Sequence, residues 1–122
     1  MKNRILVVED DPVLGPMLRK ILQKDGFDVT VVSDGRRALP ALGSGSYDAA
    51  ILDVMLPGID GIAILQRLRN SDERHGQLPV LMLTAKTDDA TTWNGWIAGA
   101  NYFMSRPFDS GELLRVLRSI MK

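Results

Sequence analysis

Short apolar runs of three or four residues recur five times along the chain. The runs are partly β-branched and show no alternation with polar residues, which is typical of strands buried on both faces of a parallel sheet. Met82 and Met104, within two of the runs, and Met55, just after another, are expected to fill the core. We predict five strands, at Ile5–Val8, Val29–Val32, Ala49–Leu52, Val80–Leu83 and Tyr102–Met104.

Between the runs, apolar residues recur at spacings of three and four, which predicts amphipathic helices. A segment between Arg36 and Leu42 is interrupted by Pro40 and is predicted to form only a short helix. Gly15 and Pro16 lead us to expect that hydrogen bonding in the first helix begins a turn later than its apolar pattern. The clear segments are Leu14–Leu22, Ile62–Leu68 and Leu113–Ile120, and the arginines expected on solvated helix faces are Arg36, Arg37, Arg67, Arg69, Arg115 and Arg118.

Strands and helices alternate throughout, and this alternation indicates the fold class. Right-handed crossovers between parallel strands place helices on both faces of an open sheet, and five units are too few for an eight-stranded barrel. We predict one α/β domain over residues 1–122, a three-layer α/β/α sandwich around a five-stranded parallel sheet. Ligands bind such sheets at the carboxyl ends of the strands, so the residues after each run are the functional candidates.

Composition narrows the classes of partner and compartment. Lys plus Arg equals Asp plus Glu at 15 each, so no excess positive charge draws the chain to DNA, and we expect no direct nucleic-acid binding. The absence of cysteine excludes disulfides, thiolate metal sites and a cysteine nucleophile, and it fits the cytoplasm. The N-terminal apolar run is too short for a signal peptide or a membrane span, so no membrane contact is expected.

Acidic residues gather after two of the predicted strands. Glu9, Asp10 and Asp11 follow the first strand, and Asp53 follows the third. Carboxylates brought together repel one another unless a cation compensates their charge or one of them takes up a proton. Mg²⁺ prefers a few carboxylate oxygens, a carbonyl and several waters, and we expect Glu9, Asp10 and Asp53 to supply the carboxylates.

The same edge of the sheet suits phosphoryl transfer. An aspartate is ionised at neutral pH and can attack phosphorus without a general base, which makes Asp53 the candidate acceptor. The transfer requires the charge on the phosphoryl oxygens to be neutralised, by a metal on one side and by cationic or hydroxyl donors on the other. Thr84, after the fourth strand, and Arg106, after the fifth, are the candidate donors.

Four blocks of the sequence resemble, in order and spacing, the signatures of the receiver domain of two-component response regulators. The blocks are Ile5–Asp11, Asp53–Gly61, Leu83–Lys86, and Gly99–Ala100 running to Arg106–Phe108. The resemblance extends along the whole chain and implies a flavodoxin-like, CheY-like fold with strand order 2-1-3-4-5. It also implies a bacterial phosphorelay protein that is phosphorylated by a sensor histidine kinase or a phosphotransfer protein and has weak self-dephosphorylating activity.

The resemblance implies roles for the acidic residues. Asp53 would be the residue that is phosphorylated. Mg²⁺ would be held by Glu9, Asp10, Asp53 and the backbone carbonyl of Met55, with Asp11 outside this shell.

A conformational switch is implied as well. Thr84 would contact the phosphoryl group, and the peptide bond between Arg106 and Pro107 would be cis. The signal would pass through Thr84 and the aromatic Phe103 to the face formed by the last strand and its flanking helices.

Arg106 stands where the family has a lysine. A guanidinium is a planar fork and an ammonium is a compact point charge, so the two do not place charge identically. Because Arg106 can grip a phosphate with two nitrogens, we expect phosphoryl acceptance to be retained with an altered rate or coupling. Two alternatives stay open: Arg106 forms a structural ion pair within the acidic cluster, or the chain is a pseudo-receiver that binds a protein without phosphorylation. A flavodoxin-like cofactor binder is disfavoured, since acidic strand ends repel a nucleotide phosphate.

An apolar patch that binds a partner protein is expected around the last strand. Trp93 and Tyr102 are the candidates, because exposed aromatic residues mark contact surfaces. The charged positions that many DNA-binding regulators of this family use for dimerisation are here Thr92, Ile97 and Asn101, so we do not expect that mode of dimerisation.

Overall fold

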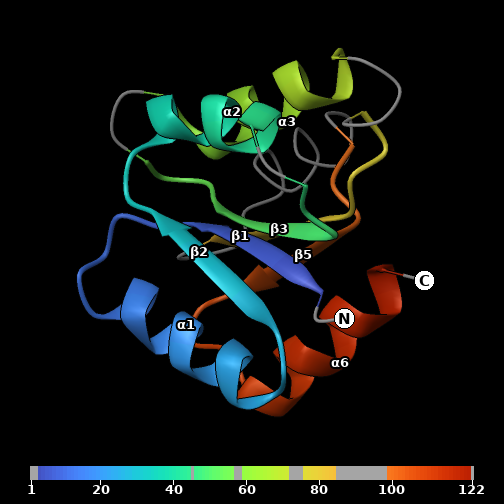
Figure 1. The fold of residues 1–122 in the computed structure, drawn as a ribbon. Coiled ribbons are helices and arrows are strands. Elements are labelled where there is room, and N and C mark those ends of the chain that lie inside the picture. Colours follow the sequence, from blue (N-terminus) through green and yellow to red (C-terminus); the bar gives the residue numbers. More distant parts are fainter. Residues whose placement is uncertain (1–2, 45, 57–58, 72–75, 85–98, 122) are drawn as a thin grey trace.

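The computed structural model describes residues 3–44, 46–56, 59–71, 76–84 and 99–121 (Figure 1). All five predicted strands are present, each one residue longer than predicted, and the added residues of the last three are Asp53, Thr84 and Ser105. The strands are β1 (Arg4–Val8), β2 (Asp28–Val32), β3 (Ala49–Asp53), β4 (Val80–Thr84) and β5 (Tyr102–Ser105). The helices are α1 (Leu14–Lys24), α2 (Gly35–Ser44), α3 (Gly61–Arg69) and α6 (Ser110–Ile120).

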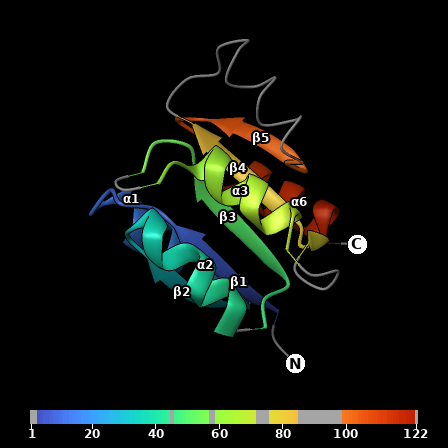
Figure 2. The same cartoon turned by 90° about the horizontal axis from the view of Figure 1, so that it is seen from above.

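The strands form one parallel sheet in the order β2-β1-β3-β4-β5, which confirms the expected topology. In Figure 1 the sheet lies between α1 and α6 on one face and α2 and α3 on the other. Figure 2 shows α2 over the half of the sheet that contains β1 and β2, and α3 over β3 and β4. The predicted three-layer α/β/α sandwich is therefore confirmed.

Two apolar clusters, one on each face, hold the layers together. Along β1, Ile5 and Val7 pack with α1 and α6, whereas Leu6 and Val8 pack with α2 and α3. Each of these four side chains is fully buried. This double burial explains why the strands read as continuous apolar runs.

Both prolines that were expected to disturb helices are accommodated, so those two predictions were wrong. Helix α1 begins at Leu14, where its apolar pattern begins, and the Gly15 amide already donates to the Asp11 carbonyl at 3.1 Å. Pro16 falls in the first turn, where a backbone N–H has no partner within the helix. Helix α2 continues for ten residues through Pro40, whose side chain is exposed.

Arg69 lies at the end of α3 and is half-buried, contrary to the expectation of a solvated helix face. Its Nε and Nη2 donate to the Gly99 carbonyl at 2.9 and 2.8 Å, and its Nη1 donates to the Leu78 carbonyl at 2.6 Å. Its Nη2 also donates to Oδ1 of Asn101 at 2.9 Å. Arg69 thereby ties α3 to the amino ends of β4 and β5.

Within the described ranges, no helix is long and apolar enough to cross a membrane.

The first residue of α2, Gly35, packs against the backbone of the loop between β3 and α3. A Cβ atom at Gly35 would lie 2.2 Å from the carbonyl oxygen of Ile59, whereas one at Gly43, in the same helix, would have no atom within 4 Å. A glycine is therefore needed at position 35, where α2 approaches the Ile59 backbone closely, and is not needed at position 43.

We expect Gly35→Ala to lower the free energy of unfolding by about 1–3 kcal/mol, because two backbone segments must separate to admit the methyl group. Gly43→Ala is the matched control and should raise the free energy of unfolding by about 0.5–1 kcal/mol, through helix propensity. Urea unfolding measures both, and equal effects at the two positions would contradict this packing.

Candidate functional site

Four polar side chains meet at the carboxyl end of the sheet. Glu9 follows β1, Asp53 ends β3, Thr84 ends β4 and Arg106 follows β5. Backbone hydrogen bonds fix their relative heights, since the Glu9 amide donates to the Val32 carbonyl at 3.0 Å and the Arg106 amide to the Thr84 carbonyl at 2.9 Å. Among the described residues, Glu9, Asp53 and Thr84 are the buried polar or charged ones, at 2%, 2% and 4% exposure. Strand ends thus bring together the residues that the sequence singled out.

Three carboxylates form a cluster that could hold a metal ion. Glu9, Asp10 and Asp53 each offer an oxygen, and these oxygens all lie within 4.8 Å of one another. Glu9 and Asp53 are buried and Asp10 is exposed, so one side of the cluster is open to solvent. Clustered carboxylate oxygens with access to water are the donor set that Mg²⁺ prefers.

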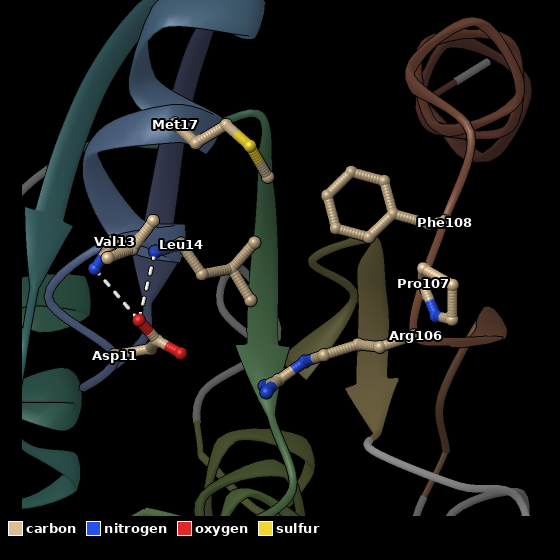
Figure 3. Close-up of a pocket in the computed structure, with 7 residues that line it drawn as sticks. All are labelled: Asp11, Val13, Leu14, Met17, Arg106, Pro107 and Phe108. Carbon is tan, nitrogen blue, oxygen red and sulfur yellow. Dashed lines mark hydrogen bonds between the residues drawn. The ribbon is translucent and has the colours of Figure 1, made fainter.

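The neighbouring acid, Asp11, is engaged elsewhere. Its Oδ1 accepts hydrogen bonds from the amides of Val13 and Leu14 at 2.8 and 3.1 Å, drawn as dashed lines in Figure 3. These bonds lower the pKa of Asp11, because they favour the ionised carboxylate. The side chain therefore caps α1, and Asp11 is not one of the three clustered carboxylates.

Arg106 bridges two of the clustered acids. Its Nη2 lies 2.8 Å from Oε1 of Glu9 and 2.6 Å from Oδ2 of Asp53. Its Nε is buried and, among the described residues, has no hydrogen-bond partner. The ion pair that the sequence left open as an alternative is present, and it involves two carboxylates rather than one.

Burial raises the pKa of Glu9 to about 8, and a side-chain hydrogen bond with Asp53 adds to the shift. The Asp11 amide donates to Oε2 of Glu9 at 3.2 Å and acts in the opposite direction, as does the positive charge of Arg106. The charge of Asp53 raises the pKa further. A proton on Glu9 is thus one way in which the cluster relieves its own repulsion.

The segment after β3 holds Asp53 in place. The Met55 amide donates to Oδ1 of Asp53 at 3.2 Å, and a Cβ atom at Gly61 would lie 2.1 Å from the Asp53 carbonyl oxygen. Gly61 therefore lets α3 start directly against the Asp53 backbone, a role that was not predicted from the sequence although the Asp-Gly pair signals a tight approach. Met55 is 71% exposed, so its assignment to the core was wrong, whereas the predictions for Met82 and Met104 are confirmed.

The two residues expected to form the switch lie on β4 and β5. Thr84 is buried at the end of β4, and Phe103 is partly buried against the apolar cluster on the α2 and α3 face. The Arg106–Pro107 bond is cis, as expected. Tyr102 is 38% exposed, while Trp93, Thr92 and Ile97 lie outside the described residues.

A cavity of about 270 Å³ opens next to the cluster and was not foreseen from the sequence. Figure 3 shows the start of α1 on one side of it and Arg106 with the residues that follow on the other. Val13 and Met17, four residues apart, are 73% and 43% exposed at its rim. Two apolar residues four positions apart, directly after the acids in the sequence, were the signal from which this rim could have been predicted. The lining consists of Asp11, Val13, Leu14, Met17, Arg106, Pro107 and Phe108.

In the metal-free protein, kept with a chelator, we expect the pKa of Glu9 to make the free energy of unfolding fall as the pH rises. The pKa is about 8 in the folded chain against an ordinary value of 4.5, so between these values the folded state keeps a proton that the unfolded state has lost. Urea unfolding at several pH values in this range should give a smaller slope for Glu9→Gln than for the natural chain. Glu112→Gln, an exposed control, should leave the slope unchanged, and equal slopes for all three chains would contradict the shift.

Comparisons with known proteins agree with this fold. The family model for the response regulator receiver domain matches residues 5–118. The transcriptional regulatory protein TcrA of Mycobacterium tuberculosis H37Rv is 43% identical over 119 residues, which is 98% of this chain and 46% of TcrA. The chain spans about half the length of the curated relatives it matches.

Solved structures give the same result. A putative response regulator from Chloroflexus aurantiacus J-10-fl is 36% identical with a TM-score of 0.93, and the match covers 99% of this chain and 98% of that one. The receiver domain of the sensor histidine kinase PA1611 from Pseudomonas aeruginosa PAO1 is 32% identical with a TM-score of 0.91, and the match again covers 99% and 98%. That structure has a magnesium ion coordinated in its active site cleft. This chain belongs to the response regulator receiver domain family of two-component systems.

Proposed function

We propose that Asp53 accepts a phosphoryl group in a Mg²⁺-dependent reaction and that the domain thereby switches the face around β5. The observation that carries this proposal is the buried Asp53 carboxylate at the end of β3, with Glu9 and Asp10 beside it and Arg106 in contact with it. A buried carboxylate with a cation on one side and further acids on the other matches the needs of an acceptor that works with a metal.

The chemistry follows from the positions of the side chains. An oxygen of Asp53 forms a bond to phosphorus while the bond between phosphorus and the donor's histidine nitrogen breaks, and that nitrogen leaves with the bonding electron pair. Arg106 and Thr84 stabilise the charge on the phosphoryl oxygens. Mg²⁺, when bound to Glu9, Asp10, Asp53 and the Met55 carbonyl, supplies further neutralisation of that charge. Attack of water on phosphorus breaks the bond between phosphorus and the Asp53 oxygen, releases inorganic phosphate and restores the carboxylate, which would give a weak self-dephosphorylating activity.

The donor protein, a sensor histidine kinase or a phosphotransfer protein, is proposed to dock over the cavity of Figure 3. Arg106 lines this cavity and also contacts Asp53, so a donor seated there would have its phosphohistidine next to the acceptor. Exposed Val13 and Met17 provide apolar contact area at the rim. Exposed apolar side chains beside a reaction centre are characteristic of protein contact sites.

The output is proposed to leave through β5, where Tyr102 and Phe103 line a second hollow together with the start of α6. TcrA is named as a transcriptional regulator, and this chain matches less than half of it. Because Lys plus Arg equals Asp plus Glu in this chain, we propose that any DNA contact is made by protein segments outside this domain. We expect the domain to work in the cytoplasm.

One observation favours a second function, a pseudo-receiver that binds proteins without phosphorylation. The Arg106 guanidinium already contacts two of the three acids that would hold the metal. If Mg²⁺ does not displace the guanidinium, Arg106 alone compensates the charge of the acids, and the site lacks the metal that phosphoryl transfer requires.

Incubation with Mg²⁺ and acetyl phosphate should add about 80 Da to the intact mass of the natural chain, as expected for one aspartyl phosphate. Asp53→Asn should remove the adduct, because an amide oxygen is a poor nucleophile toward phosphorus. An adduct that persists in Asp53→Asn would rule out Asp53 as the acceptor. No adduct in the natural chain would support the pseudo-receiver.

Replacing the exposed apolar rim of the cavity, Val13→Ser with Met17→Gln, should slow transfer from a phosphohistidine protein roughly tenfold, equivalent to about 1.4 kcal/mol of lost binding. Val13 is 73% exposed, and its side chain makes no capping hydrogen bond, so the fold should be unaffected. Labelling by acetyl phosphate should not change, since this small donor needs no docking surface. Tyr102→Ser, an exposed apolar site elsewhere, is the control, and an equal loss there would contradict docking at the cavity.

A further inference from the structure

The acids that would hold Mg²⁺ are also the acids that hold Arg106. One nitrogen, Nη2, contacts carboxylates from two strands, at 2.8 Å for Glu9 and 2.6 Å for Asp53. The same two carboxylates belong, with Asp10, to the cluster that fits a metal ion. The Arg106 guanidinium and a bound metal ion would therefore use the same two carboxylates.

We propose that Arg106 is a built-in counter-cation that competes with Mg²⁺ for Glu9 and Asp53 and so lowers the affinity of the site for the metal. The inference rests on the proposed function, because it concerns the metal site used there. Weaker metal binding has a regulatory consequence. A higher Mg²⁺ concentration is needed to fill the site than would be needed with a lysine at position 106, and only chains with a filled site are ready for phosphorylation.

The chemistry of the guanidinium supports strong competition. The Glu9 and Asp53 side chains are 1% and 3% exposed, so their attraction for a positive charge is weakly screened by water. A guanidinium is less strongly hydrated than an ammonium, and it loses less by staying in such a place. A lysine in the same position carries its charge on one strongly hydrated atom and gives up its contacts more readily.

The anchoring of Arg106 supports the same conclusion. The polar contacts described for its side chain all go to Glu9 and Asp53, and the buried Nε has no partner among the described residues. When a metal takes these carboxylate oxygens, the guanidinium loses the contacts that hold it there. The Arg106 amide remains bound to the Thr84 carbonyl, so the movement is confined to the side chain.

The cavity beside Arg106 gives the displaced side chain a place to go. It has a volume of about 270 Å³, and Arg106 and Asp11 both line it. Figure 3 shows the Arg106 side chain extended along this space toward the site, with the Asp11 carboxylate across from it. A second acid on the far side of the cavity makes release from the first two less costly.

The test is a calorimetric titration of Mg²⁺ into the natural chain, Arg106→Lys and the exposed control Arg115→Lys. Arg106→Lys should bind Mg²⁺ on the order of tenfold tighter, and Arg115→Lys should match the natural chain. Adding Glu9→Gln to the natural chain and to Arg106→Lys should shrink the difference in affinity between them, because the side chain at position 9 can then no longer ionise to bind either cation. Equal or weaker binding by Arg106→Lys, or no binding by either chain, would overturn the proposal.

The titration is independent of phosphorylation, so the two proposals can fail separately. Tighter binding by Arg106→Lys without any acetyl phosphate adduct would leave the competition intact and refute phosphoryl acceptance. An adduct in the natural chain together with equal Mg²⁺ affinities would support phosphoryl acceptance and refute the competition.

Discussion

Repulsion among carboxylates at one edge of the sheet is the constraint on which the site depends. Val8 pairs with Leu52 in the ladder between β1 and β3, so the next residues, Glu9 and Asp53, are brought side by side and cannot separate without breaking the sheet. Both are buried, so water does little to screen them. The protein has two means of compensation, a proton on Glu9 and the guanidinium of Arg106, and the three clustered carboxylates could also hold a divalent cation.

Much of the fold could be predicted from local patterns in the sequence. Strands buried on both faces leave continuous apolar runs, and acids placed after such runs had to meet where parallel strands end. The order of the strands came instead from the resemblance to receiver domains, as did the cis bond before Pro107, because neither leaves a mark in local periodicity. Helix α2 was underestimated, since proline rules describe a lost hydrogen bond and do not weigh it against the packing of Ala38 and Leu42.

The parts of the site that could not be predicted depend on distances between residues far apart in the chain. Arg106 was expected to face the acids, but its contact with both Glu9 and Asp53 through one nitrogen depends on side-chain reach from the end of β5 past β4 to the ends of β3 and β1. Arg69 had the sequence character of a solvated helix residue, yet its guanidinium meets carbonyls at the opposite end of the sheet. Local patterns assign a residue to a face of its element and do not say which chain segment passes over that face.

Two glycines allow main chain to pack directly against main chain around Asp53. Gly61 lies against the Asp53 carbonyl and Gly35 lies against the Ile59 carbonyl, so main chain meets main chain on both sides of the loop between β3 and α3. Side chains accommodate small displacements by changing rotamer, but backbone atoms in contact with backbone atoms cannot move aside in this way. A shift of the Asp53 backbone toward Gly61 would therefore have to move the start of α3 with it.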